Sequence, residues 1–300
     1  MKVLVVGKGS YIAKSFRAYA TETHSSKKDY NISVDLADSY EEWKMVDFSQ
    51  YETVIFAAGI AHRKQKKSNA HLYFSVNHDL ALDVAKKAKA EKVPQFVYLS
   101  SMAVYGKKEG EISAHTIPEA RHNDYYGASK LQAENALKNI EDQDFAVAIV
   151  RPPMVYGAGC PGRFGQLVKI AMHMPIVFDN NNKRSIIYID NLSAFLCELI
   201  LARVGGVFCP QNKEYANTAQ LAALIRQEHG KKTVILGMGS VSRLCMALFP
   251  PFRTAFGSLY YSKDVPALLY EQVEFEDSVS RSARRRRRAG RASDTEDMHQ

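Results

Sequence analysis

The first 150 residues alternate between short apolar runs and longer stretches with helical periodicity. Short runs that are apolar throughout are typical of strands buried in a parallel sheet. The alternation therefore predicts an α/β fold, a Rossmann-type doubly wound parallel sheet with helices on both faces. The predicted strands are 3–6, 31–36, 53–58, 96–99 and 146–150, and the predicted helices between them are 12–21, 72–89 and 126–138.

After about residue 155 the segments become shorter, and Gly and Pro become more frequent. Helical patterns return at 190–201 and 218–229. We expect residues 1–155 to form the main sheet domain. Residues 156–278 are expected to form a smaller C-terminal α/β region, with some elements returning to the sheet.

The last residues have a different composition. Residues 281–300 hold seven arginines, including Arg284–Arg288, and three acidic residues. Their net charge of +4 is half of the net charge of +8 of the whole chain. Because residues 279–300 have no apolar face, we expect a disordered tail. An inert solvated tail and an artefact of cloning or of the reading frame are the main interpretations. Binding of nucleic acid or an anionic surface through the arginines is the least expected.

Composition excludes several classes of protein. Hydrophobic residues make up 46% and charged residues 24%, which is too apolar for a disordered chain. No apolar stretch reaches the roughly 18 residues of a membrane helix, and the N-terminus does not have the pattern of a signal peptide. We expect a cytoplasmic protein. Four cysteines without metal-ligand spacing predict no metal site: Cys160, Cys197, Cys209 and Cys245.

A glycine turn follows the first predicted strand. Gly7 and Gly9 stand between that strand and a helical pattern, with Ser10, Tyr11 and Ile12 next. Such a turn lets the backbone approach a pyrophosphate, and the helix N-terminus offers free N–H groups to it. The position favours a dinucleotide site over a plain steric turn.

A second group of polar residues suits proton transfer. Ser100 and Ser101 end a predicted strand, where open α/β sheets bind ligands. Tyr126 and Lys130 are four residues apart, so they share one helix face, and an ammonium beside a phenol favours the phenolate. We attribute a second copy of this spacing, Tyr40 to Lys44, to chance.

Together these motifs resemble the extended short-chain dehydrogenases/reductases called the NAD-dependent epimerase/dehydratase family. The resemblance covers roughly residues 1–200. It rests on the segments 7–13, 47–48, 57–59, 73–77, 100–101, 104–106, 126–130, 151–157 and 184–190, which occur in the family's order.

The resemblance implies roles for individual residues. Ser101 would hydrogen-bond the reacting sugar oxygen, Tyr126 would be the acid/base, and Lys130 would hold the nicotinamide ribose. The implied NAD-binding set is Gly7, Gly9, Ser10, Tyr11, Ile12, Asp35, Asp47, Phe48, Ala57, Ala58, Gly59, Ser100, Tyr126, Lys130 and Pro153, with Asn77 as a structural residue behind it. The implied substrate-binding set is His62, Ser101, Met102, Met154, Phe164 and Arg184. Simple surface roles remain alternatives for His62 and Arg184.

Three details narrow the expected chemistry and cofactor. Met102 and Ala103 stand where the family's 4,6-dehydratases carry an acid and a base, so dehydration is disfavoured. Ala61 and Met154 also depart from the residues usual in UDP-galactose-type epimerases. After the second strand there are aspartates and no arginine, which favours NAD, with Asp35 as the ribose contact and NADP as the alternative.

The resemblance implies an NAD-dependent nucleotide-sugar 4-epimerase that acts on a UDP-hexose or UDP-N-acetylhexosamine through a 4-keto intermediate. Alternatives are an NAD(P)H-dependent nucleotide-4-keto-6-deoxysugar reductase and a non-catalytic dinucleotide sensor. Residues 1–155 would then bind NAD(P) and residues 156–278 the sugar nucleotide. A homodimer is a family expectation. Segment 241–261, with aromatic residues, Arg243 and Arg253, is interpreted as a packed lid or oligomer surface, with a membrane surface as the alternative.

Overall fold

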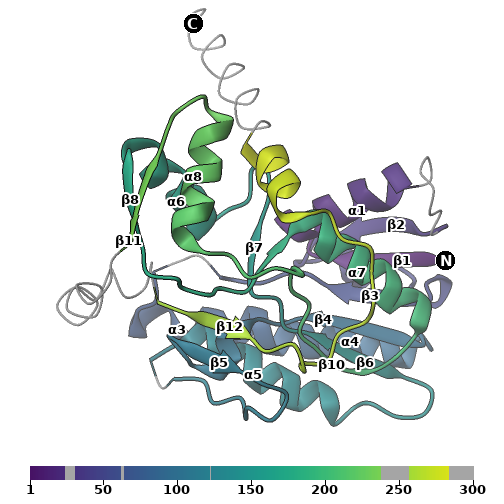
Figure 1. The fold of residues 1–300 in the computed structure, drawn as a ribbon. Helices are drawn as coiled ribbons and strands as arrows, with labels where there is room; N and C mark the ends of the chain where they lie inside the picture. The colour runs from purple at the N-terminus through teal and green to yellow at the C-terminus, as the bar shows by residue number, and fades with distance from the viewer. Residues whose placement is uncertain (24–30, 62–63, 122, 238–256, 284–300) are drawn as a thin grey trace, which may run out of the picture.

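The computed structural model describes residues 1–23, 31–61, 64–121, 123–237 and 257–283. Its main sheet has six parallel strands in the order β10-β6-β4-β3-β1-β2 (Figure 1). This order confirms the predicted Rossmann-type sheet. The chain turns to one side of β1 for β2 and to the other side for β3, so the crevice that binds ligands in such sheets lies at the carboxyl ends of β1 and β3. The strands are β1 (Lys2–Val6), β2 (Ser33–Ala37), β3 (Thr53–Phe56), β4 (Gln95–Leu99), β6 (Ala146–Val150) and β10 (Gly206–Phe208).

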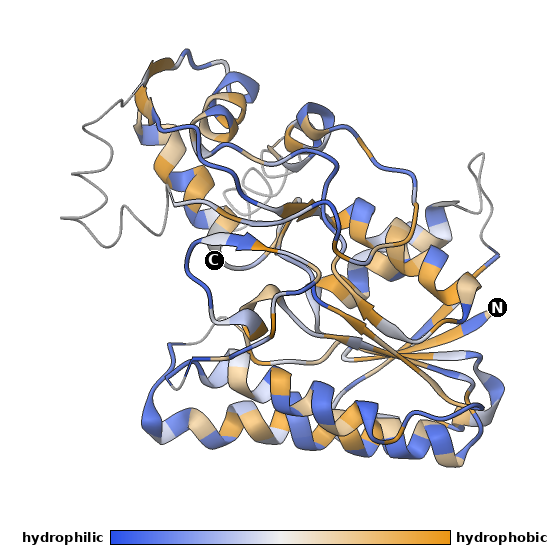
Figure 2. Cartoon of the chain, turned by 60° about the horizontal axis from the view of Figure 1, so that its bottom comes forward, coloured by the Kyte–Doolittle hydropathy of each residue, from blue (hydrophilic) through white to orange (hydrophobic). Residues whose placement is uncertain are grey.

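Helices cover both faces of the sheet because successive strand residues point to opposite sides. Val3 and Val5 face one core with α1 (Tyr11–Thr23) and α7 (Ile189–Ala202), whereas Leu4 and Val6 face the other core. The second core is closed by α4 (Leu80–Ala90) and α5 (Tyr125–Lys138), whose apolar and polar residues alternate along the bottom of Figure 2. Short elements link these helices and strands: α2 (Glu42–Met45), η1 (Phe48–Gln50), η2 (Lys67–Asn69), α3 (Ala70–Phe74), the π-helical turn η3 (Ser75–Asp79) and η4 (Met102–Tyr105).

A smaller region lies beside the carboxyl edge of the sheet and is built from three pairs of short parallel strands. Helix α7 and strand β10 come from the same part of the chain but belong to the main sheet layer. The pairs are β7 (Met154–Tyr156) with β9 (Ile186–Tyr188), β8 (Ile176–Asp179) with β11 (Val234–Gly237), and β5 (Gly110–Ile112) with β12 (Leu259–Tyr261), accompanied by α6 (Arg163–His173) and α8 (Thr218–Glu228).

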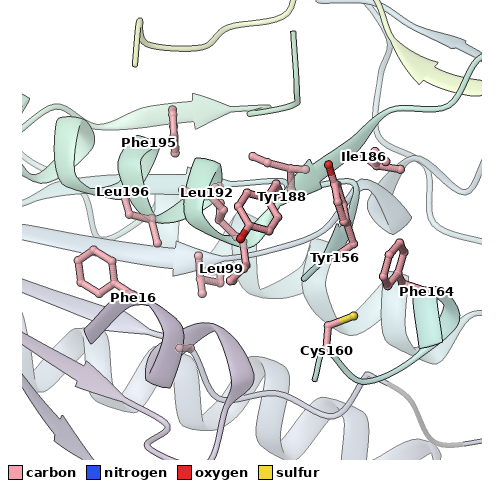
Figure 3. Packing of buried hydrophobic residues seen from close by; sticks show 14 of the residues in the cluster. Phe16, Leu99, Tyr156, Cys160, Phe164, Ile186, Tyr188, Leu192, Phe195 and Leu196 are labelled. Atoms are coloured by element: carbon pink, nitrogen blue, oxygen red, sulfur yellow. The ribbon is translucent and has the colours of Figure 1, made fainter. Parts of the chain in front are cut away.

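A last helix spans residues 275–283. Val279 on this helix is fully buried, and the hydroxyl of Ser278 is hydrogen-bonded to that of Tyr156. Tyr156 itself packs against Phe164 and Tyr188 (Figure 3). The predicted start of the tail at residue 279 is therefore corrected, because 279–283 complete this core. Residues 284–300, the rest of the predicted tail, lie outside the described residues.

Among the described residues, no helix combines the length and apolar character that a membrane span requires. Nor does this part of the chain bring three His, Cys, Asp or Glu side chains together as a metal site.

Candidate active site

The glycine turn after β1 lies against the end of β3. Gly7 has φ +116°, and a Cβ there would meet the backbone nitrogen of Ala58 at 2.5 Å. The carbonyl of Val6 accepts hydrogen bonds from Ala57 and Ala58 at 2.9 and 3.1 Å. At Gly9, in contrast, an added Cβ would meet nothing within 4 Å. Gly7 is thus required by the fold, whereas Gly9 borders open space at the start of α1.

These two glycines give separable predictions. We expect Gly7→Ala to destabilise the protein, since the new methyl group collides with backbone and the residue must keep a left-handed φ. Gly9→Ala should leave the free energy of unfolding in urea within about 0.5 kcal/mol of the wild type and weaken NAD binding, measured by calorimetry. Unchanged NAD affinity in the Gly9 variant would show that the dinucleotide does not pass over this turn.

The two aspartates near β2 have different surroundings. Asp35 is in the middle of the edge strand β2, paired with Leu4, and its carboxylate accepts a hydrogen bond from the Tyr51 hydroxyl at 2.9 Å. Asp38 follows the last residue of β2, beside the glycine turn, where Ala37 accepts hydrogen bonds from the Gly7 and Lys8 amides. The structure therefore puts Asp38, and not the predicted Asp35, at the carboxyl edge.

Charges cluster at this edge. The Lys8 ammonium lies 2.6 Å from a Glu42 carboxylate oxygen and 3.8 Å from Asp38. Backbone N–H groups of Tyr40 and Glu42, together with Lys8, hold the pKa of Asp38 below its usual value. Asp38 is consequently an anion at neutral pH.

Residues after β3 approach the predicted catalytic helix. A Cβ on Gly59 would lie 3.2 Å from Asn77 Oδ1 and 3.4 Å from Lys130 Nζ. Asn77, in the π-helical turn η3, accepts a hydrogen bond from the Ile60 amide and donates one to Ser129 Oγ at 3.0 Å. Asn77 thus ties the loop after Gly59 to α5, and π-helical turns are frequent at functional sites.

Helix α5 presents the predicted acid/base. Its first turn is capped by Asp124, whose carboxylate accepts the Gly127 amide at 3.1 Å and the Gln65 side-chain amide at 2.9 Å. The Tyr126 side chain lies beside Ser101, which follows β4. Burial raises the pKa of Tyr126, and the Ser101 hydrogen bond opposes that rise. The structure therefore brings Ser101 and Tyr126 together at the end of β4.

Lys130 lies one helical turn after Tyr126 and is buried. Its ammonium donates a hydrogen bond to the carbonyl of Leu99 at 2.8 Å and lies 4.6 Å from the centre of the Tyr98 ring. Burial lowers the pKa of Lys130 to about 7, although the Glu134 carboxylate raises it. A group whose pKa is near neutrality can change its charge during turnover.

This shift has a consequence for stability in the absence of cofactor. Between pH 7 and the ordinary lysine value of 10.5, the unfolded chain binds a proton at Lys130 that the folded protein does not. The free energy of unfolding should therefore gain a contribution that rises with pH across that window. In Lys130→Met this contribution should vanish, as measured by urea unfolding at pH 6.5 and 9. The exposed Lys44→Met is the matched control; equal pH slopes for wild type and Lys130→Met would contradict the assignment.

A buried ion pair, which the sequence-based predictions missed, lies behind these residues. Glu134 on α5 is 0% exposed and binds Arg151, at the end of β6, through two guanidinium nitrogens, with Nη2 to Oε2 at 2.5 Å. Ser100 Oγ donates to the same carboxylate, and Arg151 Nη1 donates to the Tyr105 hydroxyl at 2.8 Å. The pair links α5 to the ends of β4 and β6. Glu134 stands four residues after Lys130 on the same helix face, but this spacing does not indicate Arg151 as its partner.

Several predicted contacts are structural in this fold. Phe48 is fully buried in the core beneath α4, and Asp47 caps η1 by accepting the Ser49 amide at 3.0 Å. Phe164 is buried, 5.1 Å from Tyr156 between ring centres. The side chains of Phe48 and Phe164 are therefore packed inside the protein.

Of the remaining predicted site residues, some lie at the carboxyl edge of the main sheet and others lie away from it. Met102 and Pro153 are buried at the carboxyl ends of β4 and β6, and Met154 is half-buried in β7. Arg184 donates through Nη1 to the carbonyl of Gly257 at 2.9 Å and bridges to Ala216 through its backbone. Ser10, Tyr11 and Ile12 form the turn into α1. His62 lies outside the described residues.

A Rossmann sheet with Ser101, Tyr126 and Lys130 at its carboxyl edge defines a dehydrogenase-like architecture. Residues 3–202 match the model of the NAD-dependent epimerase/dehydratase family, and the chain belongs to that family. It is 30% identical over 195 residues to the Vibrio cholerae UDP-glucose 4-epimerase, covering 62% of this chain and 57% of that relative. It is 27% identical over 192 residues to the N-acetyl-alpha-D-glucosaminyl-diphospho-ditrans,octacis-undecaprenol 4-epimerase of Escherichia coli O157:H7, covering 61% and 56%. The matches thus span less than two thirds of these relatives.

Solved structures share the fold over most of the chain. UDP-glucuronic acid 4-epimerase from Bacillus cereus, in complex with NAD, has a TM-score of 0.69 at 18% identity and covers 96% of this chain and 99% of its own. A dTDP-4-dehydrorhamnose reductase from Bacillus anthracis, in complex with NADP, has a TM-score of 0.63 at 17% identity, covering 94% and 98%. At such identities the likeness concerns the fold alone.

Proposed function

We propose that the chain is an NAD-dependent 4-epimerase of a nucleotide sugar. The observation that carries the proposal is the placing of Ser101 beside the Tyr126 side chain, with Lys130 one turn further along the same helix and close to Gly59. Support comes from the curated relatives named as 4-epimerases, which include UDP-glucose and UDP-arabinose enzymes at 25–30% identity.

The residues at the carboxyl edge suit a dinucleotide. The space beside Gly9 at the N-terminus of α1 fits a pyrophosphate, which binds favourably to free helix N–H groups. The anionic Asp38 suits the hydroxyls of an adenosine ribose and disfavours a 2′-phosphate, so NAD is the proposed cofactor. When bound, NAD supplies a hydride acceptor that can return the hydride to the sugar.

The chain's own groups handle the proton. Tyr126, as phenolate, takes the proton from the C4 hydroxyl. It returns the proton after the 4-keto sugar has rotated and presents its other face to the cofactor. Ser101 donates a hydrogen bond to the reacting oxygen and holds it beside Tyr126. The ammonium of Lys130 stabilises the phenolate electrostatically, since both side chains lie on one face of α5.

The proposed substrates are UDP-hexoses and UDP-N-acetylhexosamines. Met102 and Ala103 offer no acid or base for water elimination, which supports epimerisation over dehydration.

The test is to denature the purified protein, identify the released nucleotide by mass, and then assay UDP-hexoses and UDP-N-acetylhexosamines for inversion at C4. We expect retained NAD and C4 inversion without added cofactor. Turnover that instead consumes added reduced cofactor on a 4-keto-6-deoxysugar would replace the proposal by a reductase. Binding of cofactor without turnover of either sugar class would favour a non-catalytic sensor.

A further inference from the structure

The two-stranded parallel sheet β8–β11 has one open apolar face. Its register pairs Ile176 with Val234 and Phe178 with Leu236. These four side chains are exposed by 47%, 55%, 42% and 44%, respectively. Neighbours in register point to the same side of a sheet, so the four form a contiguous patch, here called the β8–β11 face.

The opposite side of this sheet is covered at β8 but not at β11, where Ile235, the partner of Val177, is 43% exposed. Val177, between Ile176 and Phe178, is 2% exposed and packs in the core with Val168 of α6 and Ile225 of α8. Figure 1 shows β8 and β11 at the outer edge of the molecule, with both helices on their inner side. Parallel sheets are normally covered on both faces, so the β8–β11 face is unusual in a free protein.

Basic residues flank the face. Lys231 and Lys232 are exposed and come directly before Thr233 and β11 in the chain. The nearest acid in β8, Asp179, accepts a hydrogen bond from Asn217 Nδ2 at 2.8 Å. From residue 229 to residue 256 the sequence has four Lys or Arg residues and no Asp or Glu. An apolar surface bordered by cations matches a bilayer with anionic headgroups.

We propose that the β8–β11 face docks the protein on the surface of an anionic lipid bilayer. Ile176, Phe178, Val234 and Leu236 enter the boundary between headgroups and acyl chains, and Lys231 and Lys232 contact the headgroups. This peripheral attachment is independent of the proposed epimerase chemistry, whose residues lie at the carboxyl edge of the main sheet.

The test is co-sedimentation of the full-length chain with vesicles of phosphatidylcholine alone or with phosphatidylglycerol. Because the arginine-rich C-terminus would itself bind anionic vesicles, Arg284–Arg288 are replaced by Gln in every protein compared. We expect binding to phosphatidylglycerol vesicles that falls at least tenfold in Phe178→Ser/Leu236→Ser. Leu269→Ser, at an apolar residue 97% exposed elsewhere, is the matched control and should bind as the parent does.

A second variant leaves the apolar residues in place. Lys231→Glu/Lys232→Glu should lose most of the preference for phosphatidylglycerol at low salt. Circular dichroism and NAD binding check that each variant is folded. Absence of vesicle binding by the folded parent, or equal binding by the Phe178/Leu236 variant, would overturn the proposal. One further outcome would overturn it: light scattering shows that the parent is a dimer and the Phe178/Leu236 variant a monomer, and the parent binds no vesicles. The face would then bind a second copy of the chain.

Discussion

Replacing Tyr126 by Phe should lower kcat for C4 epimerisation by about 10²–10⁴-fold, because the substitution removes the group that carries the proton. The ring stays in place at the start of α5, so the helix and its Asp124 cap should form as before. NAD affinity should change little. The measurement is steady-state turnover with the substrate found in the screen, together with calorimetric titration of NAD.

The matched control is Tyr125→Phe, at the preceding and also half-buried residue of the same helix. Its turnover should remain within about twofold of the wild type, in line with a surface change worth less than 0.5 kcal/mol. If Tyr126→Phe turned over sugar as fast as Tyr125→Phe, the acid/base would have to be another group.

Removing the charge of Glu134 should have the largest effect on stability. Glu134→Gln leaves the buried Arg151 guanidinium without its carboxylate partner, and breaking one side of a buried ion pair costs about 3–5 kcal/mol. The substitution also removes the charge that raises the pKa of Lys130, so that pKa should fall further. Urea unfolding measures the first effect, and the pH dependence of turnover reports the second.

An exposed ion pair provides the comparison. Glu41 lies 3.0 Å from the Lys44 ammonium, and its side chain is 81% exposed. Glu41→Gln should cost less than about 1 kcal/mol, since solvent screens such pairs. Glu134→Met/Arg151→Met should recover part of the stability that Glu134→Gln loses, because no unpaired charge remains. Equal destabilisation by Glu41→Gln and Glu134→Gln would contradict the role of the buried pair.

The fold and the centre of the site could be predicted because they depend on local periodicity. Apolar runs give the strands of a parallel sheet, and the carboxyl ends of those strands meet at one edge. Helical spacing alone puts Tyr126 and Lys130 on one face. Ser101 meets Tyr126 because its strand ends at that same edge.

Other features depend on boundaries or on tertiary contacts. The second strand ends at Ala37, one residue later than predicted, which puts Asp38 rather than Asp35 beside the glycine turn. Phe48 is adjacent in sequence to an exposed aspartate, and only the packing of α4 over the sheet shows that its ring is internal. The pairing of Glu134 with Arg151 joins a helix to a strand end and has no signature in either segment alone.

The hydrogen bond between Tyr156 and Ser278 joins residues 122 positions apart. Strand β10 at the edge of the sheet is likewise paired with β6, and β7, α6, β8, β9 and α7 lie between these two strands in the chain. Contacts of such long sequence separation must be preceded by costly loop closure, which slows folding. During synthesis on the ribosome, the core around Tyr156 can close only after residue 283 has left the exit tunnel. Until then its aromatic side chains are available to chaperones and to other nascent chains.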